Sequence, residues 1–277
     1  MNLNMKKVKY SFISIISTDD YLDGLLVLFY SLKNTQSKYP FLVLLTPNIS
    51  KKTISTLNKY SISYKVLSEE IQNPTNVSQN HRWFPTYSKL HIFNQTEYDK
   101  LVFLDADMLI LRNIDELFDF PHMSATNAGG MLPRKSSWTH LNSGLIVLEP
   151  SKKLFNDMLS KIGKIEKVES GGNKLKPQYG SDQDFLNAYY PDWPNKKELH
   201  LDHKYNMFHY YLDEYNKLFG YSINEEPHPI SIIHYASYLK PWKVDKKILD
   251  ELEKDTNKIL ETKALKLWLV ERKKLSL

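Results

Sequence analysis

The run Leu101-Val102-Phe103-Leu104-Asp105-Ala106-Asp107 joins a block of bulky apolar residues to two aspartates. A short apolar block of this kind predicts a buried strand. In an open α/β sheet, ligands bind beyond the carboxyl ends of the strands, which is where Asp105 and Asp107 follow. Two carboxylates one residue apart offer hard oxygen ligands to a divalent cation. A cation there is well placed to hold a diphosphate, so the run predicts a phosphorylated ligand.

The composition predicts a folded protein with a sizeable core. The chain has 277 residues, enough for one large α/β domain or two small ones. Hydrophobic residues make up 42% and aromatic residues 13%, so we expect little disorder. The absence of cysteine excludes disulfides and thiolate metal sites, and it permits a reducing compartment.

The net charge of +5 comes almost entirely from lysine, since arginine occurs only at Arg82, Arg112, Arg134 and Arg272. Proteins that bind nucleic acids usually concentrate arginine, so we expect no nucleic-acid partner. No stretch of the sequence approaches the ~18 apolar residues of a transmembrane helix. The first ten residues are polar and show no signal-peptide pattern, so we expect a cytoplasmic location.

Strands and helices alternate through the first half of the chain. The predicted strands are Tyr10–Ser17, Phe41–Leu45, Ser63–Val66 and Leu101–Leu104. The predicted helices are Leu22–Leu32, Ser50–Tyr60 with Ser50 as its cap, Ser88–Phe93 and Asn113–Phe118. This βαβα order predicts an α/β fold with a mainly parallel central sheet and helices on both faces.

The second half of the chain is less regular. Its predicted elements are the strand Leu145–Leu148, the helix Ser151–Ile162, a loop over Glu169–Gln178, the helix Ser181–Tyr190 and the strand Ile230–His234. Val244–Leu277 predicts a charged helical tail packed on the rest of the chain. Because we find no repeat and no linker, we expect one domain at 8–243 and a C-terminal helical extension at 244–277.

A lone Asp-x-Asp pair is a weak signal, because surface turns and phosphatases of the haloacid dehalogenase type also carry it. Those phosphatases usually have it on their first strand, whereas three predicted strands precede it here. Its specificity comes from the motifs around it, which are, in order, Ser17-Thr18-Asp19-Asp20-Tyr21, Thr86-Tyr87-Ser88-Lys89-Leu90, Asn113-Ile114-Asp115-Glu116-Leu117-Phe118, Leu141-Asn142-Ser143-Gly144-Leu145, Gly180-Ser181-Asp182-Gln183-Asp184-Phe185-Leu186-Asn187, His234-Tyr235 and Lys240-Pro241-Trp242.

In this order and spacing the motifs resemble the glycogenin-like branch of glycosyltransferase family 8, over about residues 10 to 243. The resemblance implies a Rossmann-like, nucleotide-sugar-binding fold of the GT-A type. It also implies a UDP-sugar donor, Mn²⁺ in preference to Mg²⁺, and transfer with retention at the anomeric carbon.

The resemblance implies that Asp105, Asp107 and His234 hold the metal ion. A set of two carboxylates and one imidazole suits Mn²⁺, which accepts imidazole more readily than Mg²⁺ does. The ion would act as a Lewis acid on the leaving diphosphate. Lys240, six residues after His234, is expected to add positive charge there.

The same resemblance implies a set of residues that bind the nucleotide-sugar, namely Ile15, Ser17, Thr18, Tyr21, Arg82, Lys89, Ala106, Asn142, Ser143 and Ser237. Among them, Tyr21 is expected to stack on uracil, with hydroxyl groups of Ser17 and Thr18 at the edge of the base. The structural alternatives are packing of Tyr21 on the sheet and a surface charge for Lys89.

The catalytic residues implied by the resemblance are Asp182, Gln183 and Lys240. Asp182 begins a predicted helix, with Ser181 as a candidate cap, and an aspartate there also favours the helix dipole. The resemblance implies that its carboxylate lies beneath the sugar ring. There it either stabilises an oxocarbenium-like transition state or attacks as a nucleophile, and the sequence leaves both open.

Three positions depart from the family pattern. Tyr179 replaces an aspartate that helps to hold the donor sugar, which leaves the sugar undetermined. Ser237 replaces a glycine that lies against the diphosphate, and Ser181 replaces one of two glycines before Asp182.

We therefore expect a Mn²⁺-dependent retaining glycosyltransferase that moves glucose or another hexose from a UDP-sugar to a separate glycan or other acceptor. A homodimer is compatible with this function. One alternative is a self-glycosylating primer, in which the acceptor is a tyrosine eight residues after the tyrosine of a Tyr-Asn pair. Tyr205-Asn206 matches the pair, Asp213 stands at the acceptor position, and Tyr210, Tyr211 and Tyr215 lie close by. An alternative of another class is a non-catalytic nucleotide-sugar-binding protein, against which the intact set of site residues argues.

Overall fold

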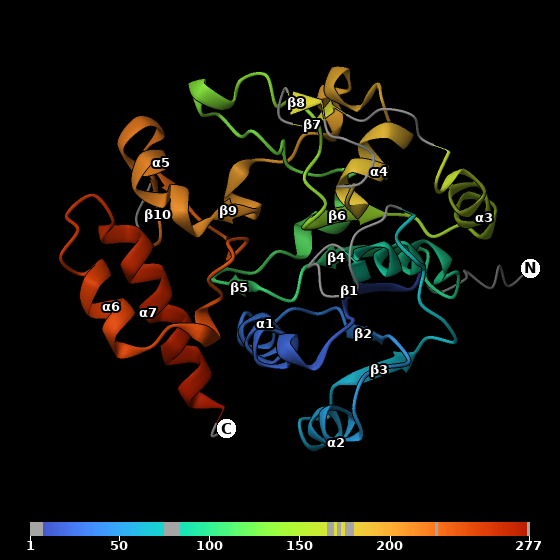
Figure 1. Cartoon of the computed structure of the whole chain (residues 1–277), viewed down its shortest axis with the longest axis horizontal. Coiled ribbons are helices and arrows are strands. Elements are labelled where there is room, and N and C mark those ends of the chain that lie inside the picture. Colours follow the sequence, from blue (N-terminus) through green and yellow to red (C-terminus); the bar gives the residue numbers. More distant parts are fainter. Residues whose placement is uncertain are drawn as a thin grey trace, which may run out of the picture.

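A five-stranded sheet forms the centre of the molecule. The computed structural model describes residues 8–74, 84–164, 169–170, 173–174, 180–224 and 227–275. In spatial order the strands are β3 (Ser63–Val66), β2 (Phe41–Leu45), β1 (Tyr10–Ile16), β4 (Lys100–Leu104) and β6 (Leu145–Leu148). The first four are parallel, and β6 runs antiparallel to β4 (Figure 1). The predicted α/β fold with a mainly parallel sheet is confirmed.

Apolar residues cover both faces of this sheet, because successive side chains of a strand point to opposite sides. On β4, Val102 and Leu104 belong to one apolar cluster and Leu101 and Phe103 to the other. The first cluster includes residues of the helices α1 (Leu22–Asn34) and α2 (Lys51–Lys59). The second includes residues of the 3₁₀-helical segment Phe84–Asn94 and of the helices α3 (Lys152–Lys161) and α4 (Asp182–Tyr189). Burial on both faces explains why β2 and β6 are continuous apolar runs, whereas the edge strand β3 is largely exposed and more polar.

The predicted element boundaries mostly hold, and the caps explain why. The Ser50 hydroxyl accepts from Thr53 N at 3.3 Å and caps the start of α2. The predicted short helices at Ser88–Phe93 and Asn113–Phe118 are 3₁₀ helices over Phe84–Asn94 and Asp115–Asp119. The predicted loop Glu169–Gln178 contains two short strands, β7 (Glu169–Ser170) and β8 (Asn173–Lys174), and its other residues lie outside the described ones. Strands of two residues are too short to show an alternating pattern.

A second, three-stranded sheet begins directly after Asp107. It consists of β5 (Met108–Ile110), β12 (Ile232–His234) and β9 (Met207–Phe208), with β12 in the middle. β12 is antiparallel to β5 and parallel to β9. The predicted strand at Ile230–His234 is therefore confirmed in shorter form, whereas β5 and β9 were not expected from the sequence. Two further short strands, β10 (Tyr221–Ser222) and β11 (His228–Pro229), pair after the helix α5 (Leu212–Phe219).

The C-terminal segment forms two helices, α6 (Lys246–Leu252) and α7 (Ile259–Lys274), rather than one continuous tail. The Asp213 carboxylate accepts from Leu260 N at 2.9 Å and Glu261 N at 3.0 Å, which fixes the start of α7. α7 lies beside α1 and α5 (Figure 1). Its Trp268 side chain is fully buried, 5.7 Å from the ring of Trp242. The predicted extension is therefore part of the main apolar core.

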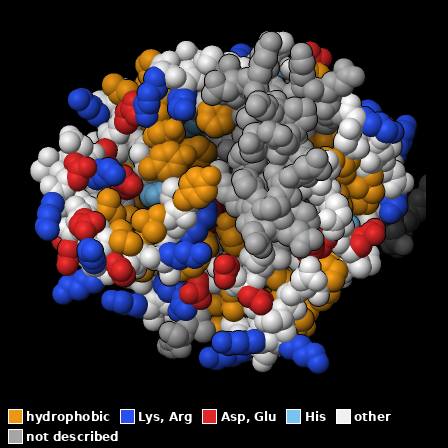
Figure 2. Space-filling model, viewed as in Figure 1, with side chains coloured by type: hydrophobic (Ala, Val, Ile, Leu, Met, Phe, Trp, Pro, Cys, Tyr) orange, Lys and Arg blue, Asp and Glu red, His pale blue; other side chains and the backbone are white. Residues whose placement is uncertain are grey.

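The surface carries charge of both signs. Figure 2 shows lysine and arginine side chains spread around one face, with aspartate and glutamate side chains between them. Within the described residues, no helix combines the length and the apolar character that a membrane span requires.

We predict that Trp268→Ala lowers the free energy of unfolding by about 3–5 kcal/mol, because it empties a fully buried indole site. Val270→Ala on the same helix is the control. Val270 is 49% exposed, so its replacement should change stability by less than about 0.5 kcal/mol. Denaturant unfolding followed by circular dichroism measures both, and equal stability of the two variants would show that α7 is dispensable for the core.

Candidate functional site

A cavity of about 430 Å³ opens at the carboxyl ends of β1 and β4. Chain order reverses between these two neighbouring strands, which is the place where open α/β sheets bind ligands. Most of the side chains predicted from the sequence line this cavity, namely Ile15, Ser17, Thr18, Tyr21, Lys89, Asp105, Ala106, Asp107, Asn142, Ser143, Asp182, Gln183, His234 and Lys240.

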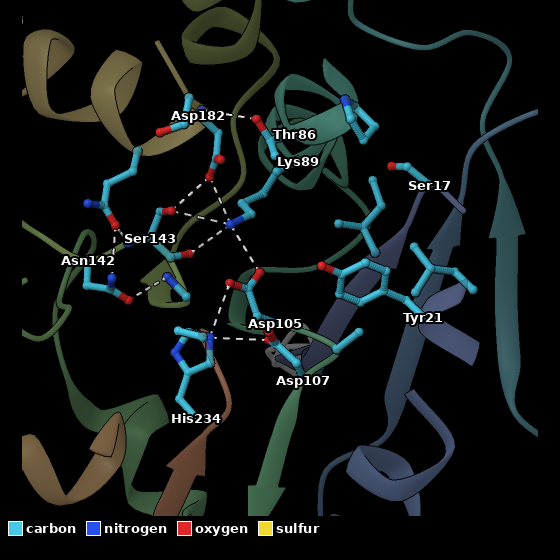
Figure 3. A pocket seen from close by; sticks show the side chains of 18 of the residues that line it. Ser17, Tyr21, Thr86, Lys89, Asp105, Asp107, Asn142, Ser143, Asp182 and His234 are labelled. Carbon is cyan, nitrogen blue, oxygen red and sulfur yellow. Dashed lines mark hydrogen bonds and ion pairs between the residues drawn. The ribbon is translucent and has the colours of Figure 1, made fainter. Parts of the chain in front are cut away.

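The pairing of β5 with β12 brings His234 to the two aspartates. β5 follows Asp107 directly, and His234 at the end of β12 stands opposite Met108. His234 Nε2 lies 3.2 Å from Asp107 Oδ1 and 3.8 Å from Asp105 Oδ2 (Figure 3). The backbone holds this arrangement, because Asp105 N donates to Gly144 O at 2.9 Å and Tyr235 N donates to Asp107 O at 2.9 Å.

These three residues fit a divalent cation. One ligand atom from each of Asp105, Asp107 and His234 lies within 4.8 Å of the others. Neighbouring oxygen ligands of a small divalent cation such as Mg²⁺ lie about 3 Å apart. Small side-chain movements would therefore bring the three ligand atoms to the distances that such a cation requires. Two carboxylate oxygens and one imidazole nitrogen form a donor set that suits Mn²⁺.

Two lysines balance the negative charge of the aspartates. Lys89 Nζ lies 3.1 Å from Asp105 Oδ1, and Lys240 Nζ lies 2.5 Å from Asp107 Oδ2. Burial disfavours the charged form of Lys89, but the charges of Asp105 and Asp182 outweigh it and raise the pKa of the ammonium. Burial likewise disfavours the charge of Asp107, but Lys240 and His234 outweigh it and hold the pKa of this carboxyl well below its usual value.

For Asp105, burial outweighs the favourable charges, so its pKa shifts in the opposite direction. Burial raises the pKa of this carboxyl, and the nearby charge of Asp107 adds to the increase despite the opposing charge of Lys89. Two carboxylates this close therefore favour binding of a cation, because a cation relieves their mutual repulsion.

The fifth charged group of the cavity, Asp182, is held at the start of α4. Ser181 and Asp184 form a reciprocal capping box there, which confirms Ser181 as the cap. Asp182 is 4% exposed, and its Oδ2 accepts from Ser143 Oγ at 2.8 Å and lies 2.8 Å from Lys89 Nζ. Lys89 therefore bridges the carboxylates of Asp105 and Asp182 (Figure 3).

The part of the cavity beside β1 is lined by Ile15, Ile16 and Tyr21. The Tyr21 ring packs edge-on against Trp242, with 5.5 Å between ring centroids. Gly24 is needed beneath them, because an added Cβ would lie 2.6 Å from Ala106 O and 2.7 Å from a ring carbon of Trp242. A flat pocket wall made by Ile15 and Tyr21 suits a planar base.

One predicted donor-binding residue, Ser237, does not line this cavity, and another, Arg82, is not placed. Ser237 is not among the lining residues, and its hydroxyl donates to Leu239 O at 2.8 Å within its own turn. Arg82 lies outside the described residues, as does Tyr179, the position where the sequence departs from the family.

The structure adds lining residues that the sequence did not single out. Trp138 and Phe208 line the cavity, as does Tyr210, which the sequence named only as a neighbour of the acceptor position, and Thr86 Oγ1 accepts from Asp182 N at 3.3 Å. Thr86 stands in a quoted motif and could have been chosen there. Trp138 and Phe208 carry no local signal, because a loop and the two-residue strand β9 place them.

Comparison with known proteins gives the family. The model of glycosyl transferase family 8 matches residues 12–246. Inositol phosphorylceramide glucuronosyltransferase 1 of Arabidopsis thaliana is 36% identical over 191 residues, which cover 68% of this chain and 32% of that protein. Glycogenin-1 of Homo sapiens is 30% identical over 241 residues, which cover 84% of this chain and 62% of that protein. The chain thus spans about a third of the first relative and less than two thirds of the second.

A solved structure agrees at the level of the fold. The glycosyltransferase GlyE of Streptococcus pneumoniae matches with a TM-score of 0.58 and 18% identity, over 96% of this chain and 63% of that chain. The α/β fold with its mainly parallel central sheet is thus that of GT-A enzymes. Because the family model covers most of the sequence, this chain belongs to glycosyl transferase family 8.

Proposed function

We propose that this chain is a retaining glycosyltransferase that takes its sugar from a UDP-sugar and depends on Mn²⁺. The observation that carries the proposal is the meeting of Asp105, Asp107 and His234 at the switch point of the sheet. Membership of family 8 supports the same function. A bound metal ion would supply Lewis acidity to the leaving diphosphate.

Side chains of the cavity supply the other requirements of donor binding. The Lys240 ammonium lies at the Asp107 carboxylate and is therefore close enough to form an ion pair with a diphosphate bound at the metal site. Tyr21, Ser17 and Thr18 line the part of the cavity that suits the uracil base. The two ends of the donor are thus matched by different chemistry, charge for the diphosphate and a flat wall for the base.

Asp182 is the residue we assign to the sugar. Its carboxylate faces the cavity near Ser143, and the Lys89 ammonium at 2.8 Å supplies a counter-charge. A carboxylate in this place stabilises positive charge at the anomeric carbon or adds to that carbon from the face opposite the diphosphate. Addition expels UDP and gives retention when the acceptor then displaces the carboxylate, whereas charge stabilisation gives retention when the acceptor attacks from the face that the diphosphate leaves.

The donor sugar is a hexose or a hexuronic acid in this proposal. Several relatives are named as glucuronosyltransferases, among them the Arabidopsis inositol phosphorylceramide enzyme and a UDP-glucuronate:xylan alpha-glucuronosyltransferase. We therefore place UDP-glucuronate beside UDP-glucose and UDP-galactose in a screen of donor hydrolysis with Mn²⁺.

The acceptor in this proposal is a separate glycan or other molecule. Asp213 occupies the position that the acceptor tyrosine has in the self-glycosylating branch. Its carboxylate accepts hydrogen bonds from the backbone at the start of α7. Tyr215 is 3% exposed and its hydroxyl accepts from Met131 N at 2.8 Å. Tyr210 lines the cavity and is 36% exposed, which keeps self-glycosylation as the second candidate. Its ring, stacked with that of Phe208, is also suited to stack on an incoming sugar.

We predict that Asp107→Asn lowers the transfer rate by at least ~100-fold, because it removes charge stabilisation worth several kcal/mol. EDTA should abolish activity in the wild type and added Mn²⁺ should restore it. Asp119→Asn, at an exposed carboxylate, is the control and should leave the rate unchanged. Full activity in chelator would contradict the metal assignment.

We predict that Asp182→Asn lowers kcat by about 100-fold while UDP affinity changes by less than about tenfold, the pattern of an interaction lost in the transition state. Steady-state kinetics and UDP calorimetry measure the two quantities. The exposed Asp192, just beyond α4, provides the control Asp192→Asn. Lost UDP binding, or an unchanged kcat, would refute this role.

We predict that the purified chain, incubated with UDP-sugars and Mn²⁺, gains no sugar in intact mass spectrometry, because its acceptor is separate. Stepwise additions that disappear in Tyr210→Phe would favour the self-glycosylating candidate instead. A triple change of Tyr210, Tyr211 and Tyr215 to Phe extends the test to the neighbouring tyrosines. Donor hydrolysis measured in the same samples shows that each variant remains active.

A further inference from the structure

A chain of side-chain amides runs behind the candidate metal site. Asn206, at the end of the 3₁₀ turn His203–Tyr205, is 4% exposed. Its Oδ1 lies 2.7 Å from His234 Nδ1, and its Nδ2 lies 2.7 Å from Asn142 Oδ1 and 3.0 Å from Thr126 Oγ1. One buried side chain thus contacts the back of the predicted metal ligand and a residue that lines the cavity beside the sugar position.

Backbone donors fix the direction of this chain. Gly144 N donates to the Asn142 side chain at 3.0 Å, so the Asn142 atom in that contact is its carbonyl oxygen. The Asn206 atom that contacts the same oxygen must then be the NH₂ group. The carbonyl oxygen of Asn206 is therefore the atom that faces His234 Nδ1.

The other end of the chain is fixed in the same way. Ser143 N donates to Gln183 Oε1 at 3.1 Å, and Asn142 Nδ2 donates to the same oxygen at 2.9 Å. This contact agrees with the orientation that Gly144 N gives to Asn142. Two independent backbone amides thus give one orientation for the three side-chain amides.

We propose that Asn206 is a positioning residue that keeps a proton on His234 Nδ1, so that Nε2 is the nitrogen available to a metal ion held with Asp105 and Asp107. The inference rests on the proposed function, because it assigns Nε2 to the metal ion of that function. A ligating imidazole needs a hydrogen-bond acceptor behind it to fix tautomer and ring orientation, and loss of that partner typically costs 10–100-fold in metal affinity.

Close packing around the ring supports this role. A Cβ added at Gly144 would lie 2.6 Å from His234 Cε1 and 2.9 Å from Asn142 Oδ1. Glycine at this position therefore lets the imidazole and the Asn142 amide approach each other. The Gly144 backbone therefore lies close to one edge of the ring, and the Asn206 carbonyl holds the ring at Nδ1.

The same chain carries a second effect toward the sugar. Asn206 donates to Asn142, and Asn142 donates to Gln183, both of which line the cavity. A residue that only filled space would stabilise the fold without linking these groups. Asn206 should therefore influence metal affinity through its carbonyl group and turnover through its NH₂ group.

The experiment compares Asn206→Ala and Asn206→Asp with Thr126→Val, which removes only the hydroxyl partner of Asn206. Calorimetry with Mn²⁺ alone should show 10–100-fold weaker binding for Asn206→Ala and less than threefold change for Thr126→Val. Asn206→Asp keeps an acceptor for Nδ1, so it should recover most of the Mn²⁺ affinity while kcat at saturating Mn²⁺ stays low. Unchanged Mn²⁺ affinity in folded Asn206→Ala would overturn the proposal.

A second measurement needs no variant of Asn206. In ¹⁵N-histidine-labelled wild type, His234 should carry a proton on Nδ1, where the Asn206 carbonyl accepts it, its signals being assigned by their loss in His234→Gln. An Nδ1 atom without a proton would overturn the proposal. If the wild type bound no Mn²⁺, the proposed function would fail. Equal Mn²⁺ binding by wild type and Asn206→Ala would contradict only the role of Asn206.

Discussion

The buried carboxylate of Asp107 is the constraint on which the arrangement of the site depends. It is 5% exposed, and taking an ion out of water costs several kcal/mol unless counter-charges and hydrogen bonds compensate. Lys240 and His234 provide that compensation at 2.5 and 3.2 Å. A site built in this way holds its negative charge in place before a cation or a diphosphate arrives, so little reorganisation is required on binding.

The short sheet and the C-terminal helices supply these partners together. β12 pairs with β5 and delivers His234, and the segment after β12 carries Lys240 and Trp242. Trp242 in turn contacts Tyr21 on the side of the cavity and Trp268 of α7. The helices beyond the family match therefore stabilise the segment that carries Lys240, although no residue of theirs lines the cavity in the described part of the chain.

The site as a whole combines charged groups in front with neutral amides behind. Lys89 links Asp105 to Asp182 across the cavity, so the metal side and the sugar side share one counter-charge. Behind them, Asn206 and Asn142 connect the same two sides through hydrogen bonds. Amide dipoles orient a ligand without adding net charge, which leaves the charge balance to the lysines and carboxylates.

Short sequence patterns were enough to predict the elements that depend only on neighbouring residues. Apolar runs predicted the strands of the central sheet, Ser50 and Ser181 marked helix starts, and the Asp105–Asp107 pair marked the ligand-binding edge. The family motifs added His234 and Lys240, which no local pattern connects to the aspartates.

Only the tertiary structure decided how distant segments meet. It divided the tail into two helices through a carboxylate, that of Asp213, far away in sequence. It also placed Asn206 behind His234. The Ser237 hydroxyl, by contrast, donates to Leu239 O within its own turn and does not line the cavity. The physical reason is that strands of two or three residues carry no readable period, so their register, and with it the position of every side chain they deliver, is set by packing and by the pairing of buried polar groups.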